Sequence, residues 1–271
     1  WEDGMIRQPV VSGQFYTDGP FELRQQVELF LSSDRKAQSA YGVMMPHAGY
    51  VYSGAIAGET LAAVEVPETV LLLGPNHRGV GHPCALYSEG GWKTPLGEVP
   101  IAEDLAKHLL DAVPQLTQEM QAHRGEHSLE VLLPFLQVKN PDLSIIPLML
   151  GQISFPILQQ LGEGIGAVLK GYEGKILIVA SSDMTHYEPS SVARKKDQLA
   201  LDALLNLDAA ALYHQVKTEH ITMCGVCAAV LMVLICRVLG ARNASLIRYG
   251  DSGDVNGDHS AVVGYAGVVI D

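Results

Sequence analysis

The sequence predicts an α/β protein: a single domain with a mixed or mostly parallel sheet and helices on both faces. Short apolar runs alternate with amphipathic stretches along all 271 residues, which is the pattern of an α/β sandwich. The apolar runs are almost continuous, as in strands that are covered on both sides. No internal repeat and no Pro/Gly/Ser-rich linker divides residues 1–271, and residues 1–4 precede Met5, a candidate natural start.

Strands are expected where Val, Ile, Leu or Met dominates a short run. Residues 42–45, 69–73, 144–150 and 175–180 form the predicted centre of the sheet, and 243–249 and 261–270 add two strands near the C-terminus. Residues 83–87 precede Gly90 and Gly91, which predicts a small hairpin with the residues that follow.

Helices are expected between these strands. Apolar residues recur at i, i+3 and i+4 in residues 23–31, 55–64, 103–113, 155–169 and 192–206. Residues 127–138 carry a stripe of leucines with Pro134 inside it, which predicts a kink at that proline. Residues 224–239 are apolar nearly all round, which predicts a buried central helix.

Composition and charge exclude two classes of partner. The formal net charge of −12 opposes binding to nucleic acid or to an anionic membrane, because both need a basic surface. The longest apolar run, residues 226–236, is too short to span a bilayer. No signal-peptide pattern is present, and the four cysteines are poorly laid out for disulfides, so we expect a cytoplasmic protein with reduced thiols.

Histidines follow three of the predicted strands at the point where each strand ends. His47 follows the first, His77 the second, and His186 follows 175–180 with Asp183 close before it. Ligands of open α/β sheets bind outside the carboxyl ends of the strands, so the three imidazoles are expected at one crevice. Imidazole is a common metal ligand and Asp183 is a candidate supporting acceptor, although an Asx-type turn explains Asp183 nearly as well.

Cys224 is the fourth candidate, because it opens the apolar segment 224–239. A helix N-terminus lowers the pKa of a thiol and favours the thiolate that binds metal. Cys84, Cys227 and Cys236 are expected to be ordinary buried cysteines. Glu126 and His127 either line the crevice or favour the start of a helix.

The remaining polar groups carry weaker signals. Residues 251–258 lack the order of a calcium loop, which favours a surface turn. Six histidines without a strand-end context are left out of the metal set: His82, His108, His123, His214, His220 and His259. Serine-hydrolase, NTPase and Rossmann motifs are absent from the sequence.

Several motifs, in order over almost the whole chain, resemble those of one family. They are 11–16 (VSGQFY), 46–54 (PHAGYVYSG), 73–77 (LGPNH), 94–97 (TPLG), 126–130 (EHSLE), 181–186 (SSDMTH) and 224–225 (CG). With these motifs the sequence resembles the Memo-like proteins, known in bacteria and archaea as AmmeMemoRadiSam system protein B.

The resemblance implies a fold similar to the class III extradiol ring-cleavage dioxygenases, which bind Fe(II) with two histidines and a carboxylate. By the Memo pattern, His47 and His77 match the two metal histidines, Cys224 the third ligand and His186 a further pocket histidine. The thiolate at the third position departs from the 2-His-1-carboxylate set, so ring cleavage does not transfer directly. Fe(II) is favoured, Cu or Zn are alternatives, and an aerobic preparation can lack the metal.

Three functions follow from this comparison. The first is a metalloenzyme with redox or dioxygenase-like chemistry, in which His186 and Asp183 move protons and Tyr50, Asn76, Glu126 and His127 line the pocket. The second is a non-enzymatic scaffold that binds a peptide or protein in the same crevice, and the third is a metal-dependent hydrolase. The family name implies AMMECR-type and radical SAM proteins as partners, besides an unidentified small molecule or peptide.

Overall fold

Four parallel strands form the middle of the fold in the computed structural model, which describes residues 6–271. β2 (Gly42–Met45), β9 (Ile176–Ser181), β3 (Thr69–Pro75) and β8 (Ser144–Leu150) are neighbours in that order. Nearly all of their residues are buried, as their continuous apolarity predicts. The prediction about residues 1–4 and Met5 lies outside the described residues.

Antiparallel strands flank this parallel centre and make the sheet mixed. β12 (Val262–Ile270) pairs with β2, and β11 (Ala244–Asp251) and the short β10 (His186–Glu188) pair with β12. At the other edge, β4 (Cys84–Leu86) pairs with β8, and β7 (Thr117–Gln118) pairs with β4. The predicted hairpin at 83–87 is therefore wrong: the buried β4 pairs with the long apolar β8 and not with the residues that follow it.

A second, small sheet lies beside the first and contains β1 (Ile6–Arg7), β5 (Gly91–Thr94) and β6 (Gly97–Pro100). Its core residue is the fully buried Trp92. These strands, with β7 and β10, were not predicted, because runs of two to four residues carry no periodicity that a sequence pattern can reveal.

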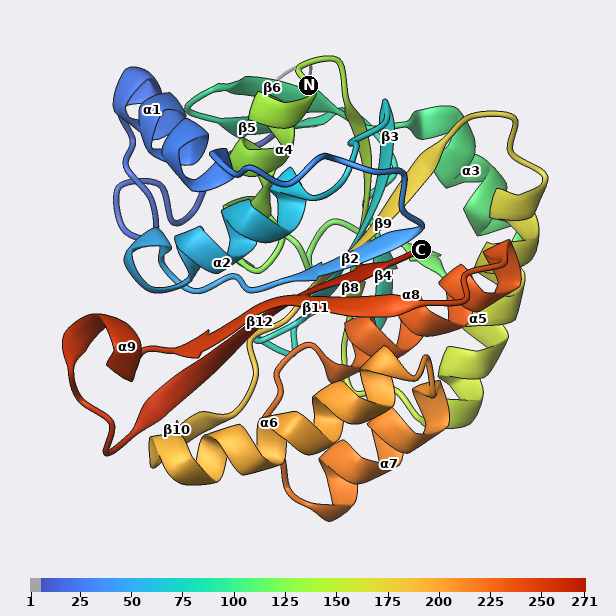
Figure 1. Ribbon diagram of the computed structural model, residues 1–271. Helices are drawn as coiled ribbons and strands as arrows, with labels where there is room; N and C mark the ends of the chain where they lie inside the picture. The colour runs from blue at the N-terminus through green and yellow to red at the C-terminus, as the bar shows by residue number, and fades with distance from the viewer. Residues whose placement is uncertain (1–5) are drawn as a thin grey trace.

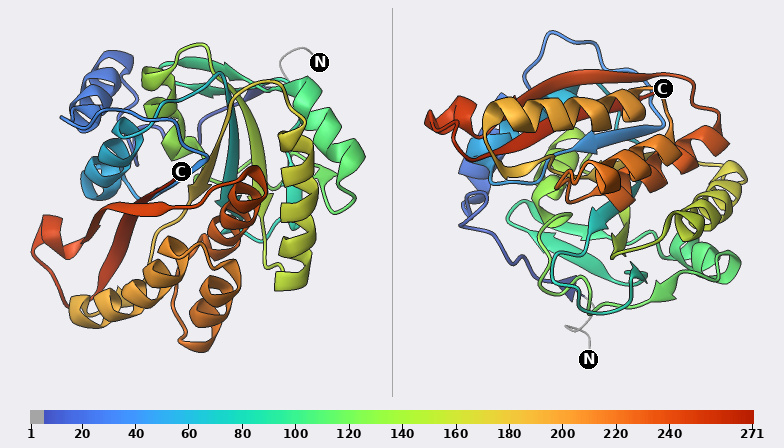
Figure 2. Two further views of the ribbon diagram at one scale, coloured as in Figure 1. Left: turned by 45° about the vertical axis from the view of Figure 1, so that its right-hand side comes forward. Right: turned by 90° about the horizontal axis from the view of Figure 1, so that it is seen from below.

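Helices cover both faces of the large sheet (Figures 1 and 2). One face carries α2, which packs on β2 and β12, together with α1 and α4; the other carries α8, which packs on β2, β3 and β9 and contacts α5, α6 and α7. The bounds are α1 Pro20–Leu31, α2 Tyr50–Ala62, α3 Glu103–Ala112, α4 Leu133–Lys139, α5 Phe155–Lys170, α6 Ser190–Leu205, α7 Ala209–Thr218, α8 Val226–Leu239 and α9 Gly253–Asn256.

Two glycines let the helices approach the sheet closely. A Cβ on Gly42 of β2 would lie 2.8 Å from Cys236 Sγ of α8, and one on Gly267 of β12 would collide with Thr60 of α2. The register pairs Val269 with Val43, so Gly42 and Gly267 point to opposite faces. The central position predicted for residues 224–239 is confirmed.

The segment 127–138 differs from the predicted kinked helix. A 3-10 turn, Glu130–Leu132, precedes α4, and Pro134 stands at the first turn of that helix. A proline costs little there, because its missing N–H would have no partner in any case. The proline thus begins a helix, and residues 127–129 stay outside it, where the backbone N–H groups of His127 and Ser128 donate to the Glu126 side chain.

The cysteines are as expected for reduced thiols. All four are free; Cys84, Cys227 and Cys236 are buried, and Cys224 is partly exposed. Residues 251–258 contain the one-turn helix α9 between β11 and β12. None of the helices in residues 6–271 is long and apolar enough to cross a membrane.

Candidate metal centre

The loops that follow β2, β3 and β9 meet at the carboxyl edge of the sheet. β9 lies between β2 and β3, so His47, His77 and the segment after Ser181 emerge side by side. Cys224 reaches the same point from the loop before α8. Gly225 allows that approach, because a Cβ there would collide with the carbonyl of Ser181, and its N–H donates to Ser182 Oγ at 3.0 Å.

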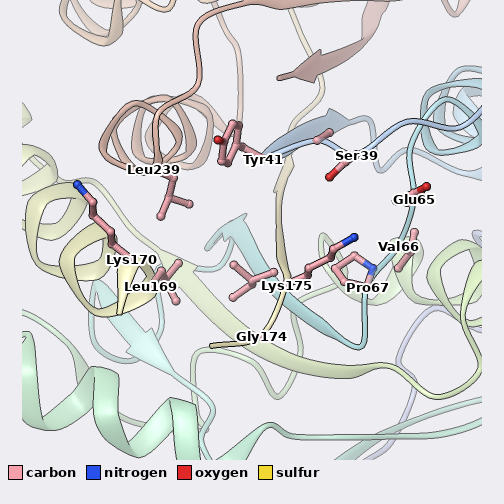
Figure 3. Close-up of a pocket in the computed structure, with 12 residues that line it drawn as sticks. Ser39, Tyr41, Glu65, Val66, Pro67, Leu169, Lys170, Gly174, Lys175 and Leu239 are labelled. Carbon is pink, nitrogen blue, oxygen red and sulfur yellow. The ribbon is translucent and has the colours of Figure 1, made fainter. Parts of the chain in front are cut away.

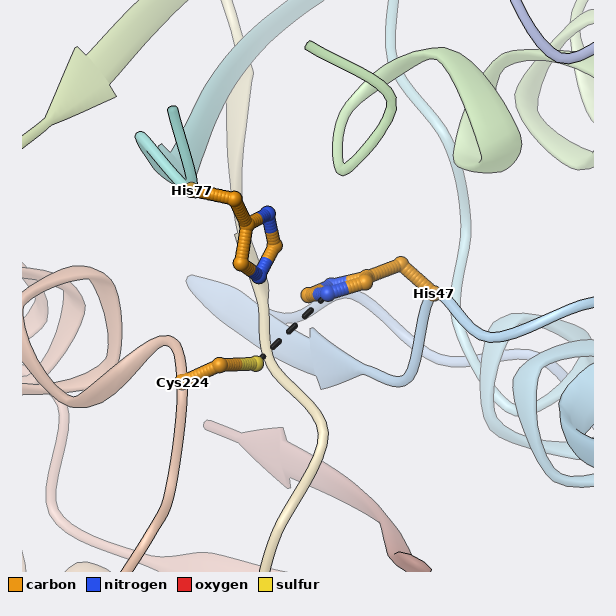
Figure 4. Close-up of side chains that lie close together, drawn as sticks. All are labelled: His47, His77 and Cys224. Atoms are coloured by element: carbon orange, nitrogen blue, oxygen red, sulfur yellow. Dashed lines mark hydrogen bonds between the residues drawn. The ribbon is translucent and has the colours of Figure 1, made fainter. Parts of the chain in front are cut away.

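His47, His77 and Cys224 converge (Figure 4). Their ligand atoms all lie within 4.8 Å of one another, and His47 Nε2 is 3.5 Å from Cys224 Sγ. The two imidazole rings stand nearly perpendicular, at 72°, with their centroids 5.2 Å apart. The strand-end histidines and the cysteine named from the sequence therefore come together as one group of donors.

The hydrogen bonds of His47 determine its tautomer. Its Nδ1 lies 2.7 Å from Ser181 Oγ, and the Ser181 hydroxyl donates to the carbonyl of Ser128 at 2.6 Å. Since that hydroxyl proton is already used, Nδ1 of His47 must be the donor and Nε2 keeps a free lone pair. Burial lowers the pKa of His47 well below its usual value, so the ring is neutral, the form that binds metal.

His77 is oriented in the same sense by Glu126. Its Nδ1 donates to the Glu126 carboxylate at 2.9 Å, which leaves Nε2 for a ligand. The same carboxylate accepts the backbone N–H groups of His77, His127 and Ser128. Burial raises the pKa of Glu126, but the hydrogen bonds from His77 and Ser128 outweigh it and lower the pKa to about 2. A buried carboxylate behind a ligand histidine is the usual outer partner of metal sites.

His127 supplies the third imidazole at the centre. Its ring stacks on His77 at 5.0 Å, stands edge-on to His47 at 5.5 Å and is covered by Phe15 at 4.8 Å. Its Nδ1 lies 3.2 Å from Glu126. Glu126 and His127 thus border the metal-binding group. His77, Glu126 and His127 are also close enough to hold a metal, but Glu126 already accepts four hydrogen bonds, three of them on Oε1.

Asp183 contacts two of the three candidate ligands, His47 and Cys224. Its Oδ1 accepts the backbone N–H of His47 at 2.8 Å, its Oδ2 lies 3.9 Å from His47 Nε2, and its own N–H points at Cys224 Sγ at 3.2 Å. Burial raises the pKa of this carboxyl. The carboxyl therefore lies beside the expected metal position.

His186 points its Nδ1 at the backbone carbonyls of Met184 and Thr222, at 2.7 and 3.0 Å. Both partners are acceptors, so Nδ1 carries the proton and Nε2 is free to accept one. Nδ1 of His186 therefore bonds to backbone carbonyls and not to Asp183, although His186 lies near enough to act on the pKa of Asp183. The role of the two residues in proton transfer stays a prediction.

The thiol of Cys224 differs from the expectation drawn from the helix N-terminus. Burial and the neighbouring Asp183 raise its pKa, so the lowered pKa predicted for a cysteine at a helix start is wrong. α8 begins two residues later, at Val226, and desolvation outweighs the hydrogen bonds from Asp183, Ser182 and Gly225, which lower the pKa. A metal ion would have to displace the thiol proton to bind.

Two residues expected in the pocket have other contacts. Tyr50 is buried among aromatic rings, and its hydroxyl donates to the carbonyl of Val131 at 2.8 Å. Asn76 closes its own turn, with its side chain bonded to Gly79 N and Val80 O. Ser181 and Ser128 were not singled out from the sequence, although both lie inside the motifs, because a serine gives no sign of which imidazole it will meet.

Other hollows and clusters lie elsewhere. A cavity of about 420 Å³, lined by Tyr41, Lys175 and Leu239 among others, opens at the amino ends of β2, β3 and β9, opposite the histidines (Figure 3). Asp251, Asp254 and His259 form another possible metal-binding group, but Arg194 already pairs with both carboxylates. The strand-end histidine group therefore remains the candidate centre.

Comparison with known proteins agrees with the motifs. The family model described as "Memo-like protein" matches residues 7–269. A MEMO1 family protein of Aquifex aeolicus is 40% identical over 266 residues, which cover 97% of this chain and 98% of the relative. One from Methanopyrus kandleri is 37% identical, covering 98% and 99%, and one from Methanosarcina barkeri is 37% identical, covering 98% and 100%.

Proposed function

The chain belongs to the Memo-like protein family, and we propose that it is a metal-dependent redox protein whose metal is bound by His47, His77 and Cys224. One observation carries the proposal: both imidazoles use Nδ1 to donate to oxygen, to Ser181 and to Glu126, and so turn Nε2 toward the thiol. Three donors within 4.8 Å, each with its orientation already set, suit a mononuclear centre.

The donor set favours a borderline or soft metal. Two neutral imidazoles and one thiolate suit Fe(II), our preferred metal, and also Cu or Zn. When bound, a redox metal supplies electron transfer and open positions for a small molecule. An aerobic preparation is expected to be prone to losing Fe(II).

His186 acts as the proton acceptor in this proposal. Its Nδ1–H is fixed on two carbonyls, so the neutral ring presents the lone pair of Nε2 to a substrate. The Asp183 carboxyl, whose pKa burial raises, lies 3.9 Å from His47 Nε2 and accepts or donates a proton beside the expected metal position. Both residues act on a substrate bound at the centre.

Elemental analysis of protein purified without oxygen tests the proposal. We expect about one metal ion per chain in the wild type and a large loss in His47→Ala, because the variant removes one of three ligands. His214→Ala, which alters a histidine on α7 packed against Phe155, is the matched control and should retain the metal. A wild-type protein that contains no metal and takes up none when Fe(II) or Zn is added would contradict the proposal.

A second function, recognition of a peptide or protein at the same crevice, is favoured by Tyr187. Its ring lies next to His186, at 5.9 Å, and 80% of the residue is exposed. AMMECR-type and radical SAM proteins are the proposed partners. Co-purification of these two proteins with wild type, His47→Ala and His186→Ala tests this function, and undiminished capture by both variants would locate binding outside the crevice.

A further inference from the structure

A buried arginine lies behind the metal centre, at the end of β1. Arg7 is 6% exposed, and its guanidinium stacks over the Trp92 ring at 4.3 Å, the residue with which it pairs across β1 and β5. We propose that Arg7 is a positioning residue for the metal centre: it fixes the turn 123–126 and thereby directs the Glu126 carboxylate at His77. This inference rests on the proposed metal-binding function.

The guanidinium is bonded to both ends of that turn. Its Nε donates to the carbonyl of His123 at 2.8 Å, and its Nη2 donates to the carbonyl of Glu126. Its Nη1 donates to Glu130 at 2.8 Å, just beyond the turn. A planar guanidinium is the side chain that can make these three bonds in three fixed directions at once.

The turn held by Arg7 carries the carboxylate that orients His77. Glu126 accepts Nδ1–H and the backbone N–H of His77, at 2.9 and 2.8 Å. A shift of the Glu126 backbone would move this acceptor and change the direction of His77 Nε2. The path from Arg7 to the ligand atom thus runs through the main chain and side chain of a single residue, Glu126.

Glu130, the ion-pair partner of Arg7, holds the segment 10–16, which packs against the histidine group. Glu130 is fully buried and accepts the backbone N–H groups of Val10 and Val11 and the hydroxyl of Tyr16. The segment tied down in this way contains Phe15, which packs on the ring of His127. The Arg7–Glu130 pair therefore fastens both sides of the histidine group.

Cobalt binding tests this role. Co²⁺ bound to a thiolate gives a charge-transfer band, so a titration reports both affinity and the presence of Cys224 among the ligands. In Arg7→Lys we expect the Co²⁺ dissociation constant to rise about 10-fold and the band to weaken, by analogy with the loss of outer partners of metal ligands. Arg194→Lys, which alters the other arginine bonded to a buried carboxylate, should bind Co²⁺ like the wild type.

A double-mutant cycle separates positioning from general destabilisation. If Arg7 acts through Glu126, Arg7→Lys should weaken Co²⁺ binding much less in a Glu126→Gln background than in the wild type. Full additivity of the two effects, or a folded Arg7→Lys with wild-type affinity and band, would overturn the inference. A wild type that binds no Co²⁺ would instead refute the metal site itself.

If Arg7→Lys fails to fold, a second variant in which both Arg7 and Glu130 are made neutral tests the same role. Arg7→Gln combined with Glu130→Gln leaves no unpaired buried charge, yet it removes the three-way bonding of the guanidinium. We expect this variant to be folded by circular dichroism and to bind Co²⁺ about 10-fold more weakly than the wild type. A folded double variant with wild-type Co²⁺ affinity would overturn the inference.

Discussion

At the scale of single residues, the candidate centre depends on small polar groups behind the ligands. Ser181 and Glu126 each accept an Nδ1–H from a candidate ligand histidine, and each is in turn bonded to the backbone of Ser128. The two candidate histidine ligands follow strand ends in the sequence, and Cys224 stands just before the apolar helix α8. Ser181 and Glu126, whose hydrogen bonds fix the tautomers of His47 and His77, come from other segments of the chain. No spacing in the sequence therefore links each of them to its histidine.

Removing the acceptor of His47 is expected to weaken metal binding. In Ser181→Ala, Nδ1–H of His47 has no partner and the ring is free to change tautomer, so the metal dissociation constant should rise about 10-fold or more. Thermal unfolding and Co²⁺ titration of the same samples measure stability and affinity separately. Thr60→Ala is the control, because it removes a buried hydroxyl that donates to the carbonyl of Ile56 within α2. An equal loss of Co²⁺ affinity in this control would contradict the explanation from the His47 tautomer.

Tyr187 has a backbone conformation that is costly for its type. Its φ is 60°, and it is the extra residue of a bulge between β10 and β12, where His186 and Glu188 pair with successive residues. Tyr187→Gly should raise the free energy of unfolding by about 0.5 kcal/mol, because glycine relieves a strain of about 1–2 kcal/mol and loses roughly 0.5–1 kcal/mol more backbone entropy on folding. The exposed ring contributes little burial. Denaturant unfolding measures this change in free energy.

Leu207 is the matched control for Tyr187, since its φ is 53° but its side chain is buried. Leu207→Gly should lower stability, because the lost burial exceeds the relieved strain. A Tyr187→Gly variant less stable than the wild type would contradict this prediction, because the backbone entropy of glycine and the lost ring contact with His186 would then outweigh the relieved strain.

At the scale of elements, helix and strand positions follow from apolar periodicity, and the exceptions have local causes. The predicted central strands and the long helices appear within a few residues of their expected bounds. α7 and the short strands were missed, and Pro134 begins α4 instead of kinking a longer helix. These cases depend on which neighbour a short segment meets, and a pattern of a few residues carries no such information.

Because α8 packs closely against β2, no side chain larger than that of glycine is expected to fit at position 42 without loss of stability. Gly42→Ala would place its Cβ 2.8 Å from Cys236 Sγ, so we expect a loss of about 1–3 kcal/mol in the free energy of unfolding. Denaturant titration gives the value. Adding Cys236→Ala removes the sulfur and should recover part of that loss; a double variant no more stable than Gly42→Ala would contradict the steric explanation.

At the scale of the whole molecule, buried neutral histidines make stability depend on pH. Burial lowers the pKa of His47, His127 and His123, the last to about 3. His123 Nε2 donates to the carbonyl of Ala85, while its buried Nδ1 has no partner among the described residues. Below about pH 6.5 these histidines bind protons in the unfolded chain, whereas they stay neutral in the folded chain.

The metal-free protein is therefore expected to lose stability as the pH falls from about 6.5 toward 3. His123 alone should lower the free energy of unfolding by about 2 kcal/mol at pH 5, relative to its value above pH 6.5, where the histidine is neutral in both states. His123→Gln, which keeps a donor for Ala85, should flatten the dependence of unfolding free energy on pH in this window. An unchanged slope in that variant, or an equal flattening in the exposed-histidine control His220→Gln, would contradict the assignment.

The sequence by itself determined the α/β class, the central strands, the family and the three ligand candidates His47, His77 and Cys224. These features are local: apolar periodicity sets the elements, and His47 and His77 stand directly after strands, whose carboxyl ends must meet at one edge of a parallel sheet. Cys224 follows from its place before a buried helix and from the family motif. Only the tertiary structure decided that His127 joins the histidine group, that Nδ1 of His186 bonds to backbone carbonyls, and that burial raises the pKa of Cys224. Each of these depends on groups far apart in the chain, whose distances and desolvation exist only after folding.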